Sequence, residues 1–187
     1  VSGFASVDID TVDDFALAEV VHAYLSQEFP VEPTYWNPED HASVVYEIDV
    51  PEILEKDGVE LADYSHENMM IVNARKILKD TKENSWMRRV VNSESNSACI
   101  ITQLPGQGNR LHFHPSWNEW WYILQGEWDF TIAGSVHRVV KDDIVFIPRN
   151  TWHKITATGT GPASRLAVSR ADVKHGYDLT KLKEETP

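Results

Sequence analysis

The hydrophobic pattern of the chain changes near residue 86. Beyond that point, short segments rich in Val, Ile, Phe, Tyr and Trp are separated at roughly regular spacing by Gly, Pro, Asn and Asp. Such a pattern is typical of an antiparallel sandwich or barrel. We therefore predict a mostly β domain over residues 86–172. Its expected strands lie in SWMRRVVN, SACIITQLP, LHFHP, EWWYILQGEWDFTIAG, SVHRVVKDDIVFIP, WHKITATG and SRLAVSR.

The first 85 residues have a mixed pattern. Apolar side chains recur at spacings of three and four over residues 10–28, which predicts an amphipathic helix. Residues 44–50 alternate enough to predict a strand. Residues 67–81 are ambiguous, because MMIV favours a strand and ARKILKD favours a helix. The predicted organisation is an N-terminal α/β elaboration (1–85), a barrel (86–172) and a C-terminal tail (173–187).

Charge and cysteine usage narrow the function classes. The chain has 17 basic and 29 acidic residues, a net charge of −12, and phosphate binding needs Lys and Arg, so we expect neither nucleic acid nor a membrane as partner. No apolar run approaches the roughly 20 residues of a membrane span, and the acidic N-terminus does not resemble a signal peptide. Cys99 is the only cysteine. These features favour a cytoplasmic protein with a small-molecule partner.

One short stretch carries candidate metal chemistry. His112 and His114 are two residues apart on an expected strand, so both imidazoles point to one face. After a turn, Glu119 opens the next strand and can reach the same point, and His153 follows a turn much further along the chain. A single histidine on a strand is usually only a hydrogen-bonded residue. Three imidazole nitrogens and one carboxylate, however, suit Fe(II), Mn, Ni, Co or Zn.

The spacing around these residues resembles that of the cupins. Their first motif, G(X)5HXH(X)3–4E(X)6G, matches GQGNRLHFHPSWNEWWYILQG (106–126) at every defined position. Their second motif, G(X)5PXG(X)2H(X)3N, matches DDIVFIPRNTWHKITA at Pro148 and His153. The chain departs from the second motif at three positions, Asp142, Asn150 and Ala157. Asparagine tolerates the left-handed conformation, so Asn150 can hold the turn in place of glycine.

The resemblance implies a double-stranded β-helix, the cupin jelly-roll barrel, over roughly residues 86–172. It also implies one divalent metal ion inside the barrel, with Fe(II) as the expected ion. By motif position, the ligands are His112, His114, Glu119 and His153. Because cupins often pair barrels through outer strands, the resemblance further implies a homodimer.

Strand parity predicts the lining of the cavity. Arg110 lies two residues before His112, so we expect it to face inward at the barrel mouth, where a guanidinium suits an anionic substrate group. Trp121 and Ile123 share the face of Glu119 and should line the cavity, whereas Trp120 and Tyr122 face the other way. Aromatic residues on strands are nevertheless more often core than binding site. Weaker candidates are His137, Arg138, Arg165, His175 and Tyr177.

Three functions stay open at this point. We expect a mononuclear Fe(II) dioxygenase that acts on a small anionic organic substrate, with Arg110 holding the acidic group and Trp121 forming a cavity wall. The alternative is a redox-silent isomerase, lyase or hydrolase in which the metal acts as a Lewis acid, with His137 and Tyr177 as weak candidates for proton transfer. A non-enzymatic cupin that binds a small ligand ranks last.

Overall fold

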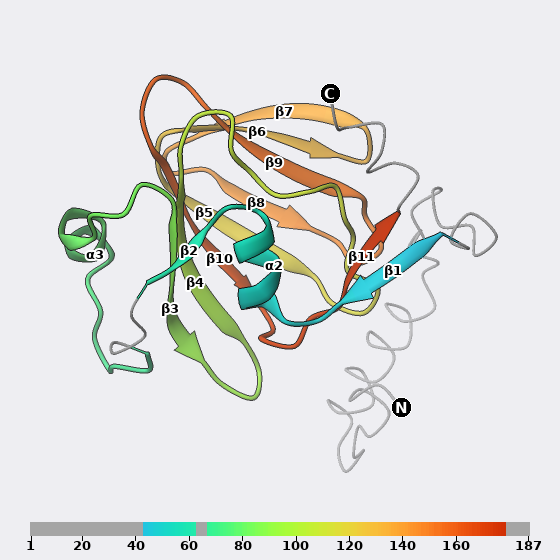
Figure 1. Ribbon diagram of the computed structural model, residues 1–187, viewed down its shortest axis with the longest axis horizontal. Helices are drawn as coiled ribbons and strands as arrows, with labels where there is room; N and C mark the ends of the chain where they lie inside the picture. The colour runs from blue at the N-terminus through green and yellow to red at the C-terminus, as the bar shows by residue number, and fades with distance from the viewer. Residues whose placement is uncertain (1–42, 63–66, 179–187) are drawn as a thin grey trace, which may run out of the picture. The chain divides into compact units, whose positions relative to one another are not determined.

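A computed structural model describes residues 43–62 and 67–178 (Figure 1). The strands form a six-stranded sheet in the order β2-β3-β4-β10-β5-β8, a three-stranded sheet in the order β7-β6-β9, and a β1-β11 pair. All pairs are antiparallel except β2 with β3. The strands are β1 (Val44–Glu47), β2 (Glu60–Leu61), β3 (Trp86–Asn92), β4 (Ser97–Gln103), β5 (Glu119–Gln125), β6 (Glu127–Ile132), β7 (Ser135–Val140), β8 (Ile144–Ile147), β9 (His153–Thr158), β10 (Ala163–Ser169) and β11 (His175–Asp178), and the helices are α2 (Val50–Lys56) and α3 (Ala74–Asp80).

The barrel core lies between the two larger sheets. Alternate residues of each strand point to opposite faces, so one face of each sheet is apolar. Trp121 and Ile123 of β5 pack in one buried cluster with Trp128 and Phe130 of β6, which belongs to the other sheet. This packing of two antiparallel sheets confirms the predicted mostly β jelly-roll barrel.

The N-terminal predictions are confirmed only in part. The helix expected over residues 10–28 lies outside the described residues. The expected strand 44–50 is shorter, because β1 ends at Glu47 and Val50 begins α2. Asp49 starts this helix by accepting a hydrogen bond from the backbone N–H of Glu52 at 3.1 Å, and Pro51 fits the first turn.

The ambiguous span 67–81 resolves into a helix in its second half. Asn73 caps α3 by accepting from the backbone N–H of Lys76 at 2.9 Å, and residues 69–72 form no strand. Neither described helix is long and apolar enough to cross a membrane.

Strand pairing joins the three predicted parts of the chain. β2, which precedes the predicted barrel, pairs with β3 in the six-stranded sheet. β1 pairs with β11, which lies in the predicted tail (Figure 1). The boundaries at 85/86 and 172/173 stay predictions. Strand pairs join residues on the two sides of each boundary. The consequence for the site is that α2 and β11 come to lie against the barrel.

Candidate metal centre

A short segment carrying two of the predicted ligands runs between β9 and β11. The backbones of His112 and His153 exchange two hydrogen bonds, of 3.0 and 2.8 Å, and Phe113 bridges to Gly176 of β11. Phe113 is fully buried and packs its ring against Trp152, with the centroids 4.7 Å apart. His112 and His114, on either side of Phe113 in the sequence, both supply atoms to one group of possible metal ligands, as the parity argument predicts.

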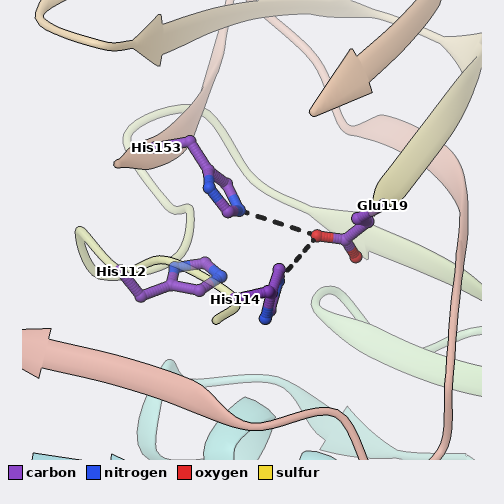
Figure 2. A group of neighbouring side chains, drawn as sticks. All are labelled: His112, His114, Glu119 and His153. Atoms are coloured by element: carbon purple, nitrogen blue, oxygen red, sulfur yellow. Dashed lines mark hydrogen bonds and ion pairs between the residues drawn. The ribbon is translucent and has the colours of Figure 1, made fainter. Parts of the chain in front are cut away.

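The four predicted ligand residues converge (Figure 2). One ligand atom from each of His112, His114, Glu119 and His153 lies within 4.8 Å of all the others. Glu119 Oε2 is 3.1 Å from His114 Nε2 and 3.6 Å from His153 Nε2. The three histidines are at most 2% exposed and Glu119 is 9% exposed. The structure thus assembles one buried cluster from residues 41 positions apart in the sequence.

Backbone carbonyls orient all three imidazoles. Each Nδ1 lies at hydrogen-bond distance from a carbonyl oxygen, which can only accept, so the proton sits on Nδ1. The Nε2 lone pairs then face the centre of the cluster, and a carbonyl contact of this kind is the usual support of a metal-binding histidine. The acceptors are the carbonyls of Arg110 (2.8 Å from His112), Lys174 (3.0 Å from His114) and Thr151 (2.8 Å from His153).

The cluster fits a divalent cation. With its proton on Nδ1, His114 directs a lone pair at a carboxylate oxygen of Glu119 only 3.1 Å away. Such a contact needs either a doubly protonated imidazolium or a cation shared by the two atoms. His153 Nε2 is buried and has no hydrogen-bond partner among the described residues. Three imidazole nitrogens and a carboxylate oxygen could therefore hold a first-row divalent metal ion.

The electrostatic environment favours the protonation states that a metal requires. Burial lowers the pKa of His112 well below its ordinary value, and the neighbouring His153 and His175 add to this effect. Burial also lowers the pKa of His153. Burial alone would raise the pKa of Glu119, but its contacts with His114 and His153 outweigh burial and hold it well below the usual range. The neutral imidazoles of His112 and His153 and the ionised carboxylate of Glu119 are ready to bind metal without losing protons first.

These shifts predict that the metal-free protein loses stability in mild acid. Burial lowers the pKa of His175 to about 3 from an ordinary value of 6.5, and the pKa values of His112 and His153 are also lowered. Below pH 6.5 these histidines bind protons in the unfolded chain but stay neutral in the native state. The free energy of unfolding therefore decreases as the pH falls toward 3. Each such histidine costs about 1.4 kcal/mol per pH unit.

Urea titrations of the metal-free protein at pH 7.5, 6 and 5 measure this loss directly. We expect the unfolding free energy to fall between pH 6 and 5 by at least the contribution of one histidine. His137→Asn should show the same slope, because His137 is exposed on β7. An unfolding free energy that stays constant across this interval would contradict the prediction.

Trp121 orients the carboxylate of the cluster. Its indole Nε1 donates to Glu119 Oε1 at 3.1 Å, while Glu119 Oε2 faces the histidines. Trp121 is 2% exposed and Ile123 is fully buried, whereas Trp120 is 40% exposed, so the predicted parity of β5 is confirmed. Trp121 lines the cavity beside the cluster, but Ile123, which was also predicted to line it, packs in the buried core instead. Its contact with a substrate stays a prediction.

Arg110 lies at the rim and is already paired. Its Nε donates to Asp57 Oδ1 at 2.7 Å, its Nη2 is 3.3 Å from Glu47 Oε2, and its guanidinium lies over the ring of Tyr177 at 4.3 Å. Arg110 does not line the cavity, although Asp57 does. Its role in binding a substrate anion stays a prediction, and two carboxylates already neutralise its charge.

The weaker candidates divide into two groups. His137 and Arg138 are exposed on β7 and do not line the cavity, and Arg138 pairs with Asp129 and Glu127. Arg165, His175 and Tyr177 all line it. His175 stacks on His112 with ring centroids 4.8 Å apart and meets His114 edge-on at 4.4 Å.

The cavity beside the cluster is small and has one wall that the sequence did not suggest. Its volume is about 60 Å³, which is room for roughly four to six water-sized groups. Ile53, Leu54 and Asp57, from α2 and the residue that caps it, close one side. No local signal in the sequence could have placed this helix there, because the contact joins segments more than fifty residues apart.

The comparisons with known proteins find a family model and relatives that each match part of the chain. Residues 99–169 match the model of the cupin domain. An uncharacterised protein, MJ1618, of Methanocaldococcus jannaschii is 34% identical over 70 residues, which are 37% of this chain and 56% of that protein. The tetracenomycin polyketide synthase protein TcmJ of Streptomyces glaucescens is 29% identical over 63 residues, 34% of this chain and 42% of that protein. The chain thus spans about half the length of these curated relatives.

A solved structure is also similar to part of the chain. The crystal structure of TT1209 from Thermus thermophilus is 22% identical and has a TM-score of 0.49. The likeness covers 55% of this chain and 97% of that chain.

Proposed function

We propose that this chain, a member of the cupin superfamily through its residues 99–169, is a mononuclear metal-dependent enzyme, and specifically an Fe(II) dioxygenase acting on a small organic substrate. The observation that carries the proposal is the cluster itself. Three Nδ1-protonated imidazoles and one ionised carboxylate direct their free electron pairs at a common point. In six-coordination, four protein ligands leave two positions for a substrate and a second reactant.

The residues around the cluster suit such a reaction in three ways. The carbonyl contacts at Nδ1 hold the imidazoles in place, and Trp121 holds the carboxylate. The side chains of Ile53, Leu54 and Ile101 give the cavity an apolar wall. A cavity of about 60 Å³ restricts the substrate to a molecule, or the end of a molecule, of a few non-hydrogen atoms. Iron bound there would supply the redox chemistry with dioxygen.

Metal analysis and oxygen consumption together test this function. The protein is purified anaerobically without added metal, and its metal content is determined by elemental analysis. Near-stoichiometric iron in the wild type, lost in His112→Ala, is the expected result. Oxygen uptake is then screened with small carboxylic acids, phenols and thiols. A protein that takes up no metal under any loading condition would refute the enzyme proposal and leave a ligand-binding cupin.

One observation favours a second candidate, a redox-silent isomerase or lyase. His175 lines the cavity next to the cluster, and its Nδ1 contacts the carbonyl of Val173 at 3.0 Å, so Nε2 is the atom that could exchange a proton, as a weak base because burial lowers its pKa to about 3. His137, one of the residues that the sequence suggested for this task, is exposed on β7 instead. Zinc, manganese or nickel in the purified protein, without oxygen uptake, would favour this candidate.

The homodimer and the cytoplasmic location stay predictions. Aromatic residues do face outward on the six-stranded sheet, with Trp120 of β5 40% exposed and Phe146 of β8 58% exposed. Such apolar residues are compatible with a pairing of two barrels.

A further inference from the structure

Arg165 is a cation inside the barrel. It lies on β10, is 2% exposed, and lines the same cavity as His112 and Glu119. Its guanidinium carbon lies 4.6 Å from the ring centroid of Trp128, a fully buried residue of the core. Buried arginines are rare unless a partner compensates their charge, so the surroundings of this guanidinium matter.

The hydrogen bonding of Arg165 is incomplete. Its Nη1 donates to Gln103 Oε1 at 2.8 Å, and Gln103 is itself held by donating to the carbonyl of Gly108 at 2.9 Å. The Nε of Arg165 is buried and has no hydrogen-bond partner in the part of the chain that the structure describes. Within residues 43–62 and 67–178, no carboxylate forms an ion pair with this guanidinium. Arg110, by contrast, has two carboxylate partners.

The charges around the cavity favour an anionic occupant. Of the other charged side chains that line the cavity, Asp57 is paired with Arg110 and Arg170 is paired with Asp172. The cavity then contains the carboxylate of Glu119 and the guanidinium of Arg165, whose charges cancel. A divalent ion at the histidine cluster would raise the total to about +2. An uncompensated positive charge in a low-dielectric site attracts an anion far more strongly than it would in water.

We propose that Arg165, rather than Arg110, binds the anionic group of the ligand, and that this ligand is a small carboxylate whose other end reaches the metal centre. The inference rests on the proposed function, since it places the carboxylate in the cavity of the proposed metal centre. Arginine suits the task because its planar fork can donate two parallel hydrogen bonds to a carboxylate. The cavity size limits the part of the ligand that it encloses to a short acid.

Binding of acetate and its neutral isostere acetamide tests the proposal. Both are titrated into metal-loaded protein and followed by tryptophan fluorescence, because Trp128 lies directly against the guanidinium. The variants are Arg165→Gln, Arg110→Gln and the surface control Arg138→Gln. Arg165→Met serves as a second neutral variant, since its unbranched side chain suits a buried site. Near-ultraviolet circular dichroism and elemental analysis establish folding and metal content for each protein.

We expect a loss of affinity only in the Arg165 variants and only for the charged ligand, acetate. Arg165→Gln and Arg165→Met should weaken acetate binding by at least about tenfold, because a hydrogen bond to a charged group is lost. Their metal content and their affinity for acetamide should stay close to wild type, and Arg138→Gln should bind acetate normally. Unchanged acetate affinity in both Arg165 variants would overturn the proposal. So would a loss confined to Arg110→Gln, which would instead support the role predicted from the sequence.

The metal measurement separates this inference from the proposed function. If the proteins bind metal but Arg165→Gln binds acetate like the wild type, the inference fails and the metal enzyme stands. If the wild type takes up no metal, the proposed function fails, and the same titration of the metal-free protein still decides whether Arg165 binds the anion.

Discussion

Replacing His153 with alanine is expected to lower the affinity for the metal by more than 100-fold. The loss should exceed the 10- to 100-fold effect of removing a group that only supports a ligand, because a ligand itself is removed. His153 is fully buried, and its Nε2 has no hydrogen-bond partner among the described residues. Titration with a fluorescent metal competitor measures the affinity, and the proposed oxygen uptake should disappear with the metal.

The matched control is His137→Ala, which removes an exposed histidine of β7. It should bind metal like the wild type. Because His153→Ala also leaves a hole in the core, Glu119→Gln provides a second test that preserves shape. It removes the negative charge and should also weaken metal binding strongly without unfolding the protein. Metal affinity close to wild type in both ligand variants would show that the cluster is not the metal site.

Gly108→Ala is expected to destabilise the fold by about 2–3 kcal/mol, the cost of forcing atoms into a packed interior. A Cβ at this position would lie 1.8 Å from the carbonyl oxygen of Ile155, so the backbone must move. Gly108 bridges to Thr156 of β9, and the same segment leads to the bridge between His112 and His153. The variant should therefore also weaken metal binding. Urea denaturation of the metal-free protein measures the loss of stability.

Gly161→Ala is the control for this substitution. A Cβ at Gly161 would meet no atom within 4 Å, and its backbone is not in the left-handed region. It should leave stability and metal affinity nearly unchanged. A Gly108→Ala protein as stable as Gly161→Ala would mean that the close approach of the segment to β9 does not support the metal centre.

The sequence predicted that Asn150 could hold its turn in place of a glycine, and the structure shows the same for Asp142. Asn150 and Asp142 stand where the motif has glycines, and both adopt positive φ, at 61° and 76°. Asparagine and aspartate are the side chains that best tolerate this conformation, so the turns keep their shape. Ala157, at the third departure, is buried in the barrel core. The turn that precedes the predicted ligand His153 therefore keeps its shape despite the altered sequence, and His153 reaches the cluster.

Arg110 and Arg165 mark the limit of the parity argument. Parity correctly separates the two faces of β5, because side chains alternate between the faces with a period of two residues along a regular strand. Arg110 instead lies on an irregular segment, and its direction is decided by Asp57 and Glu47, which no local rule connects to it. In the described part of the chain, Arg165 lines the cavity without a carboxylate partner, and its burial and partners depend on the strands beside β10.

The sequence by itself determined the barrel and the four residues of the cluster. Strand alternation and turn residues are local and predict an antiparallel sandwich or barrel, and the resemblance to the cupin motifs implies the ligands His112, His114, Glu119 and His153. Only the tertiary structure decided where α2 lies, which carbonyls orient the imidazoles, and which of the two arginines has no carboxylate partner among the described residues. These features are contacts between distant segments, and their energies depend on burial and distance rather than on neighbouring residues.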